Sequence, residues 1–310
     1  MKTSQIAVHH QNFGTSFWMN ISNQTSSDDL AQIPSVYVRD NDSVKTIIAV
    51  YVDDLIMSDT EHEMNLAKQN LATRFKMKDL GKLHYCLGIN IKQEEETLSL
   101  HTNHYMLQIL KRFGMEDAKP MLTPADVNVR LVKDDGVSKP VQPESYQAMV
   151  GSFLYLTIAT CPDISHAVGA VSKYCAAPTE ARLTAAKGVL RYLKGSLDIR
   201  ITYHRSSNNK VFGYSDANWA GDLDDRHSMS GNIFLLSGSP ISWLSKRQSV
   251  VAVSIAESEY TSLFHGTKEA MWLNQLITDI GLSASAEPTK MMVDNQDAIK
   301  IAQILMNMAA

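Results

Sequence analysis

The sequence has 310 residues, of which 44% are hydrophobic and 20% are charged. This is the composition of a globular chain of about two domains. The 15 glycines and nine prolines are too few for a collagen-like or proline-rich disordered chain, and the three cysteines exclude a disulfide scaffold and a cysteine-rich zinc site. The net charge of −4 means that any nucleic-acid contact must use local basic patches.

No segment predicts a membrane span or a secretory signal. The longest apolar run, residues 47–52, is strand-sized and far below the roughly 20 residues that a membrane helix requires. The first ten residues contain one lysine and no sustained apolar stretch, unlike a signal peptide. We therefore expect no membrane partner, and the sequence carries no recognisable cellular address.

The first 34 residues are polar and weakly periodic, so we expect poor order there. From residue 35 onward, short apolar runs alternate with turn residues and helix starts, which predicts a strand, a hairpin, a helix, a second hairpin and a helix. These elements cover residues 35–39, 47–57, 60–75, 83–101 and 103–113.

The rest of the chain predicts a connector, three helices and then a layered α/β region. Residues 114–142 contain three prolines and read as the connector. Later prolines suit the first turns of helices over 143–160, 162–176 and 178–194. Strands are predicted at 199–203, 211–215, 231–236, 241–244 and 291–293, and helices at 256–280 and 296–305. Strands followed by a helix, a strand and a helix indicate an α/β arrangement.

Asp53 and Asp54 are adjacent carboxylates at a tight turn between apolar strands. Like charges this close repel one another, and a divalent cation relieves the conflict. Hard oxygen ligands suit Mg²⁺ or Mn²⁺, the cations of two-metal phosphoryl transfer. A solvated turn is the alternative, because turns favour aspartate whatever their function.

Longer motifs carry a resemblance to a known family. Tyr51-Val-Asp-Asp-Leu55 after an apolar strand resembles the active-site hairpin of reverse transcriptases. Further motifs stand in the same order as in the Pol polyproteins of Ty1/copia-type LTR retrotransposons, which this sequence resembles over about residues 35–303. They lie at 75–89, 149–156, 162–164, 190–195 and 214–226.

The resemblance implies a fold and a domain order. It implies an α/β chain with an α+β reverse-transcriptase palm fragment over 35–113, a helical connection over 114–205 and an RNase H-like mixed-sheet domain over 206–310. In this family the residues matching Asp53 and Asp54 are the catalytic, metal-binding aspartates of the polymerase. Those matching Leu87 and Gly88 grip the primer end, and Tyr51 of the same hairpin is a nucleic-acid contact.

In the RNase H-like part, the resemblance and the predicted elements together mark three carboxylates. Asp216 lies at the end of a predicted strand, Glu259 in the first turn of the long helix and Asp294 at the end of a later strand, so they could converge at one end of a sheet. A two-metal nuclease needs such a set. Glu257 is a second candidate for the helix carboxylate, but Glu259 precedes a tyrosine as the family's catalytic glutamate does.

Four further residues are candidates for contacts with the nucleic-acid backbone. Ser228 and Ser230 offer hydroxyl groups, and Lys246 and Arg247 offer positive charges for phosphates. An ordinary polar surface is an equal alternative for all four, because exposed lysine and arginine are common.

The sequence also departs from the family. The reverse-transcriptase fingers and the palm strand with a third metal-binding aspartate would precede Tyr51 by more than 50 residues, and the RNase H domain would continue beyond Asp294 to a fourth carboxylate. We therefore expect a truncated Pol fragment that has lost DNA synthesis and keeps weak nuclease activity or none.

The family implies Mg²⁺, with Mn²⁺ as substitute, and a primer-template or an RNA–DNA hybrid as partner. Its ancestral chemistry is RNA-directed DNA polymerisation and hydrolysis of RNA in hybrids, in cytoplasmic particles. The alternatives are a non-catalytic nucleic-acid-binding or assembly remnant, and a subunit that pairs with a complete Pol chain through the apolar helices at 143–194.

Overall fold

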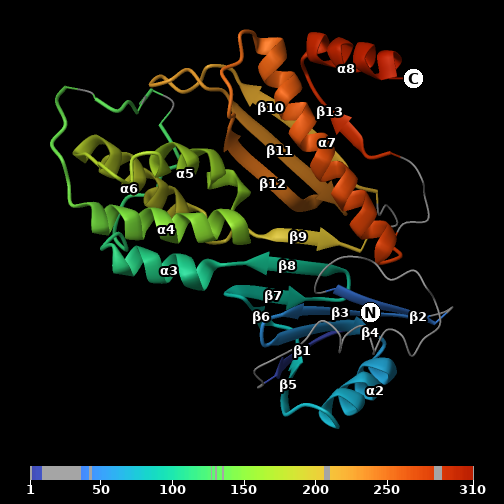
Figure 1. Ribbon diagram of the computed structural model, residues 1–310. Coiled ribbons are helices and arrows are strands. Elements are labelled where there is room, and N and C mark those ends of the chain that lie inside the picture. The colour runs from blue at the N-terminus through green and yellow to red at the C-terminus, as the bar shows by residue number, and fades with distance from the viewer. Residues whose placement is uncertain are drawn as a thin grey trace. The chain divides into compact units, whose positions relative to one another are not determined.

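The computed structural model in Figure 1 describes residues 2–8, 36–41, 44–126, 128–129, 131–134, 136–205, 210–282 and 288–309. It divides into two compact units. Unit 1 comprises residues 1–86 and 272–288, and unit 2 comprises residues 87–271 and 289–310. Several sheets and helices make up the chain, which confirms the predicted mixed α/β class.

Unit 1 is built on a five-stranded sheet with the order β2-β3-β4-β1-β5. Apolar side chains from three of the strands and from the helix that follows β4, Ile6, Leu55, Met57 and Met64 among them, form one buried cluster. Helix α2 (Glu61–Ala72) begins where the capping box predicts, because Thr60 accepts a hydrogen bond from the Glu63 N–H. The strands are β1 (Lys2–Val8), β2 (Val36–Asn41), β3 (Val44–Tyr51), β4 (Asp54–Asp59), β5 (Met77–Lys82) and the short β6 (Tyr85–Cys86).

Two of these strands were not predicted. The expectation of poor order is wrong for residues 2–8, because β1 pairs on one side with β4 and on the other with β5 and buries Ile6 completely. Neither β1 nor β5 shows a clear alternation of apolar and polar residues, so pairing with neighbouring strands decides their conformation. Residues 1 and 9–34, to which the rest of that expectation refers, lie outside the described residues.

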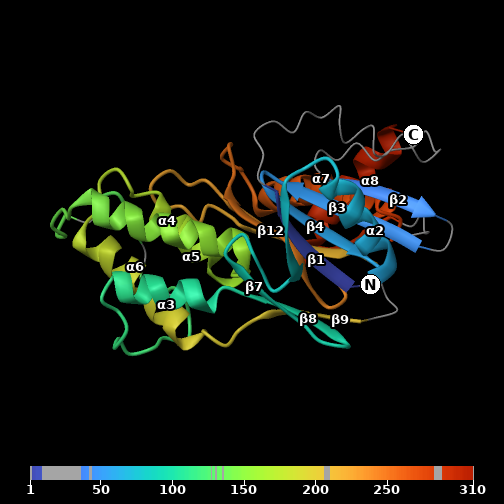
Figure 2. The same cartoon turned by 90° about the horizontal axis from the view of Figure 1, so that it is seen from below.

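The N-terminal half of unit 2 is a helical bundle (Figure 2). Its core comes from the inward faces of the four helices, with Tyr146, Phe153, Leu190 and Leu193 fully buried. The helices are α3 (Asn103–Arg112), α4 (Pro143–Ala159), α5 (Ser165–Ser172), which follows the 3₁₀ turn η1 (Pro162–Ile164), and α6 (Glu180–Gly195). These positions confirm the predicted helices within a few residues, and Pro143 and Pro162 stand in first turns.

Two further sheets complete unit 2. An antiparallel sheet joins β7 (Ile89–Gln93), β8 (Thr97–His101) and β9 (Ile201–His204). A mixed sheet has the order β12-β11-β10-β13, and α7 runs across it (Figure 1). The strands of this sheet are β10 (Phe212–Asn218), β11 (Met229–Leu236), β12 (Ser239–Arg247) and β13 (Lys290–Met292). Helix α7 (Ile255–Asp279) stands between β12 and β13 in the chain, and α8 (Gln296–Ala309) follows β13. Among the residues described, no helix is both long enough and apolar enough to cross a membrane.

Candidate metal centre and nucleic-acid contacts

The structure brings three of the predicted site residues together. Asp216 on β10, Glu259 on α7 and Asp294 after β13 each offer a carboxylate oxygen, and these oxygens all lie within 4.8 Å of one another. Asp216 and Asp294 are exposed, whereas Glu259 is only 4% exposed. No other group of three possible metal ligands of this kind occurs within the described part of the chain.

The register of two parallel strands explains this convergence. β10 and β13 run side by side in the same direction, with Tyr214 opposite Met292. Asp216 and Asp294 each stand two residues further on, so both lie at the same end of this strand pair. Glu259 is the fifth residue of α7, slightly beyond the predicted first turn, and the helix lies over the buried face of β10.

The electrostatics of the cluster favour a bound cation. Burial raises the pKa of Glu259, the carboxylates of Asp216 and Asp294 raise it further, and a hydrogen bond from the Ala217 N–H opposes them. The Glu259 Oε2 atom is buried without a hydrogen-bond partner. An unpartnered oxygen among three hard ligands fits a divalent cation such as Mg²⁺ or Mn²⁺.

Glu257, the other candidate on α7, has a different role. Its side chain accepts a hydrogen bond from the Val253 N–H at 2.7 Å, and its own N–H donates to Ser254 Oγ at 3.2 Å. These contacts cap the start of the helix. The geometry therefore places Glu259, rather than Glu257, with the two aspartates.

The Asp-Asp turn forms the predicted hairpin in unit 1. Tyr51 pairs with Asp54 across the turn, Tyr51 is 59% exposed, and Asp53 is exposed as well. Val52 at the tip has φ of 50°, a conformation that a β-branched residue rarely adopts. Asp54 accepts a hydrogen bond from the Gln5 side chain at 3.3 Å. Within the described residues no third carboxylate joins this pair.

Leu87 and Gly88, the predicted primer-grip residues, form a tight turn in unit 2. Both have positive φ, 51° and 82°. The Tyr155 hydroxyl donates to the Leu87 carbonyl at 2.7 Å, and a Cβ on residue 88 would collide with that hydroxyl. Glycine is thus required at 88 by its φ and by this close approach. Leu87 is 45% exposed, and its role in binding nucleic acid stays a prediction.

Ser228 and Ser230 do not lie where the prediction needs them. Both side chains are buried, at 0% and 3% exposure. Ser228 Oγ accepts from the Ala220 N–H at 3.1 Å, and Ser230 Oγ accepts from Gln248 Nε2 at 2.9 Å. These hydroxyl groups are bonded inside the fold, so they would have to leave these partners to contact a nucleic-acid backbone, and that contact stays a prediction.

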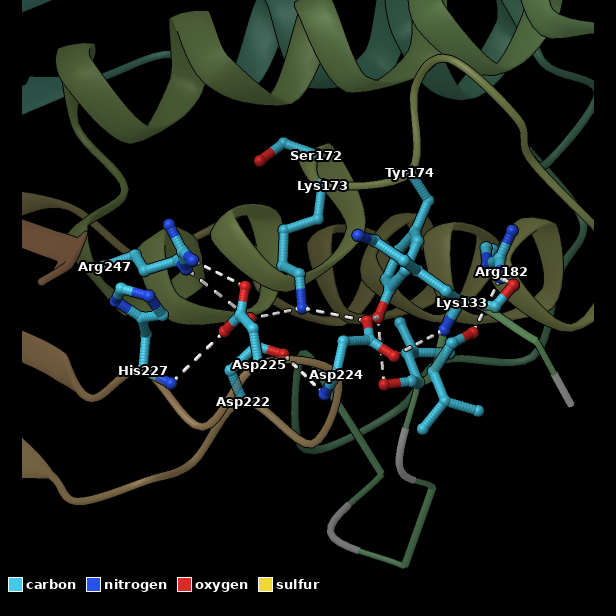
Figure 3. Close-up of polar contacts among 12 residues, drawn as sticks. Lys133, Ser172, Lys173, Tyr174, Arg182, Asp222, Asp224, Asp225, His227 and Arg247 are labelled. Carbon is cyan, nitrogen blue, oxygen red and sulfur yellow. Dashed lines mark hydrogen bonds and ion pairs between the residues drawn. The ribbon is translucent and has the colours of Figure 1, made fainter. Parts of the chain in front are cut away.

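Arg247 faces carboxylates of its own chain (Figure 3). Its guanidinium group lies 2.5 Å from Asp225 and 3.8 Å from Asp222, both in the loop between β10 and β11. Lys173, at the end of α5, pairs with the same loop through Asp222 and Asp224. The charge of Arg247 is therefore already compensated, and a phosphate would have to displace these carboxylates. Lys246 is exposed and stays a predicted phosphate contact.

Sequence reasoning missed the polar residues that surround the carboxylates. Ser262, on α7, and Gln248, in the loop before it, are buried and donate hydrogen bonds to backbone carbonyls at or beside two of the three acids. One signal was available, because Ser258 and Ser262 are spaced four apart in an otherwise apolar helix face. For Gln248, in a loop, no pattern pointed to burial.

Comparison with known proteins places the chain in a family. Residues 16–127 match the family of reverse transcriptases, described as RNA-dependent DNA polymerases. The chain is 37% identical over 255 residues to the retrovirus-related Pol polyprotein from transposon RE1 of Arabidopsis thaliana, over 82% of this chain and 17% of that protein. It is 39% identical over 242 residues to the corresponding RE2 polyprotein, over 77% of this chain and 16% of that one. The uncharacterized mitochondrial protein AtMg00810 of the same plant is 37% identical over 226 residues, which are 73% of this chain and 93% of that protein.

The chain thus carries a reverse-transcriptase family region. More particularly, it belongs to the family of Ty1/copia-type retrotransposon Pol polyproteins, as the resemblance predicted. It spans 17% and 16% of the length of the RE1 and RE2 polyproteins. The reverse-transcriptase match begins at residue 16, inside the segment that we had set apart from the resemblance.

Proposed function

We propose that unit 2 carries an RNase H-like nuclease centre, in which Asp216, Glu259 and Asp294 bind Mg²⁺, or Mn²⁺ as its substitute. The substrate is the RNA strand of an RNA–DNA hybrid. The observation that carries this proposal is the convergence of the three carboxylate oxygens within 4.8 Å. The family supports it, because reverse transcriptases act on nucleic acid.

The three acidic residues differ in exposure, and we assign them different roles on that basis. When bound, divalent cations activate a water for in-line attack on the phosphodiester and stabilise the leaving oxygen. Asp216 and Asp294 are exposed, so their carboxylates can meet a substrate that arrives from solvent. Glu259 is buried and anchors the site from the protein side, with one oxygen held by the Ala217 N–H and the other unpartnered.

A cleavage assay tests this function. The purified chain is incubated with a labelled RNA–DNA hybrid in Mg²⁺ and then in Mn²⁺, beside the Asp216→Asn variant. We expect cleavage by the unaltered chain and loss of cleavage in the variant. A folded chain that leaves the hybrid intact in both metals would move the function to the alternative, a non-catalytic nucleic-acid-binding or assembly protein.

We also propose that this chain does not synthesise DNA by itself. Asp53 and Asp54 stand without a third carboxylate in the described part of the chain, and the side chain that reaches Asp54 from β1 is the amide of Gln5. An amide supplies no negative charge to balance a second cation. Primer extension on an RNA template in Mg²⁺ tests this, and incorporation of nucleotides would refute it.

Pairing with a complete Pol chain remains a second candidate. Most apolar residues of the helices predicted to form this contact are already buried, because α4, α5 and α6 pack against one another. Leu154 and Ile158, one turn apart on α4, stay 45% and 80% exposed and supply the observation that favours a contact. A pull-down with a full-length Pol chain, compared between the unaltered protein and Ile158→Glu, tests it.

A further inference from the structure

The contact between α7 and the mixed sheet is polar near the three carboxylates. Packing a helix on a sheet ordinarily uses apolar side chains, and a buried polar group is costly unless it is hydrogen bonded. Here the buried residues of this contact include Ser215, Ser230, Asn232, Gln248, Ser258 and Ser262, all at most 7% exposed. The side-chain amide of Asn232 is buried without a hydrogen-bond partner, whereas Ser262 and Gln248 donate hydrogen bonds toward the residues of the proposed centre.

Ser262 connects α7 to the strand that carries Asp216. Its hydroxyl donates to the Asp216 backbone carbonyl at 2.7 Å, and the carbonyl of the cross-strand partner Gly231 lies at 3.4 Å. Ser215 in turn donates to Ser262 Oγ at 3.1 Å. The Ser262 hydroxyl thus fixes the distance between α7 and the backbone of Asp216.

Gln248 makes the corresponding contact on the helix side. Its Nε2 donates to the carbonyl of Ser258 at 2.8 Å, the residue directly before Glu259, and to Ser230 Oγ at 2.9 Å. Gln248 is itself held, since its N–H donates to the Ser228 carbonyl at 2.8 Å. The turn of α7 that presents Glu259 is therefore tied to β11.

Gly266 allows the close approach that these bonds need. It lies four residues after Ser262 and eight after Ser258, on the same face of α7. A Cβ at this position would lie 2.5 Å from Asn232 Oδ1 and 2.9 Å from the Met291 terminal methyl group. A larger residue here would force the ends of the Asn232 and Met291 side chains, or the helix itself, to shift.

We propose that Ser262 and Gln248 are positioning residues, which hold Asp216 and Glu259 at the separation that a shared divalent cation requires. The inference rests on the proposed nuclease centre. It explains why hydroxyl and amide groups, rather than apolar side chains, occupy these buried positions, since only hydrogen-bond donors can bind the carbonyls of Asp216 and Ser258. Neither residue reaches the cation, and both act through the backbone of the ligands.

The test measures Mn²⁺ binding to the full chain by electron paramagnetic resonance, beside unfolding by urea. Ser262→Ala is compared with Ser242→Ala, a matched control, because Ser242 also bonds the sheet to α7, through Glu269 at 2.6 Å, far along the helix from the carboxylates. We expect the Mn²⁺ dissociation constant to rise about fivefold in Ser262→Ala, the effect of one lost hydrogen bond, and less than twofold in Ser242→Ala. Ser262→Cys, which keeps a weak donor, should fall between, and takes the place of Ser262→Ala if that variant does not fold.

The outcomes separate the inference from the proposed function. Equal Mn²⁺ affinity in the unaltered chain and in the Ser262 and Gln248→Met variants would overturn the positioning role while the nuclease centre stands. An unaltered chain that binds no Mn²⁺, or binds it equally well as Asp216→Asn, would overturn both. A lower urea midpoint with unchanged Mn²⁺ affinity would show that these residues only stabilise the fold, and would also refute the inference.

Discussion

Replacing Glu259 by glutamine should stabilise the metal-free protein at neutral pH while it removes cation binding. Oxygens of Asp216 and Asp294 lie within 4.8 Å of the Glu259 carboxylate. Two unit charges at that distance repel by about 1 kcal/mol in water and about 3.5 kcal/mol at an effective dielectric constant near 20. Because both aspartates are exposed, the lower figure applies to each pair, and the relief should be about 1–3 kcal/mol.

The pKa of Glu259 also determines how the stability of the metal-free protein changes with pH. The pKa of Glu259 is raised in the folded state, first by burial and then by the two aspartates. The folded chain therefore holds this proton more tightly than the unfolded chain does. The metal-free protein should lose stability as the pH rises from about 4.5, the ordinary value, through the raised pKa, and Glu259→Gln should lack this loss.

Urea unfolding in EDTA and in Mg²⁺ measures both effects. At a Mg²⁺ concentration 100 times its dissociation constant, the unaltered chain should gain about 2.7 kcal/mol and the variant much less. Glu257→Gln is the control, and it should leave stability unchanged or lower it, because that carboxylate caps the helix at the Val253 N–H. A Glu259→Gln variant that is less stable in EDTA and gains as much from Mg²⁺ would refute the electrostatic reasoning.

Two smaller predictions follow from strain and from an ion-pair cluster. Val52→Gly should raise the free energy of unfolding in urea by up to about 1 kcal/mol, because Val52 has φ of 50° and is 72% exposed. Relief of the backbone strain, about 1–2 kcal/mol, exceeds the entropy cost of glycine. A destabilised variant would show that the turn is not strained. For Asp224, burial alone would raise the pKa, but the Lys133 N–H, the Tyr174 hydroxyl and Lys173 together lower it. Asp224→Asn should therefore lower stability by about 1–2 kcal/mol at pH 7. The difference from the unaltered chain, measured as thermal midpoints, should shrink as the pH falls from about 3.8, the ordinary value, through the lowered pKa of Asp224. A difference independent of pH would contradict the assignment.

Strongly patterned segments could be predicted from the sequence, and context-dependent ones could not. The hairpin around Asp54 and helix α2 follow from apolar alternation and a capping box, which are local signals. Strand β1 contributes Ile6 to the buried cluster and gains its conformation from two neighbouring strands. Local reading cannot see such pairing partners.

The candidate site shows the same division. Asp216 and Asp294 follow predicted strands, so their meeting at one edge was accessible once the strands were taken as parallel neighbours. The burial of Ser230 was not predicted, because serine is typical of the protein surface. Ser230 shares a strand face with Phe234, which is fully buried, and period-two alternation alone would have put both beneath α7.

The two acidic sites of this chain differ in how well solvent and hydrogen-bond donors already stabilise their carboxylates. At the hairpin, Asp53 is exposed to water and Asp54 receives a hydrogen bond from Gln5, so neither charge requires a cation for stability. At the second site, Glu259 is buried beside two carboxylates and keeps one oxygen without a partner. A buried charge that has one oxygen without a donor and faces like charges is costly until a cation arrives. The demand for metal therefore lies in unit 2, and Mn²⁺ binding to the unaltered chain should disappear in Asp216→Asn and persist in Asp53→Asn.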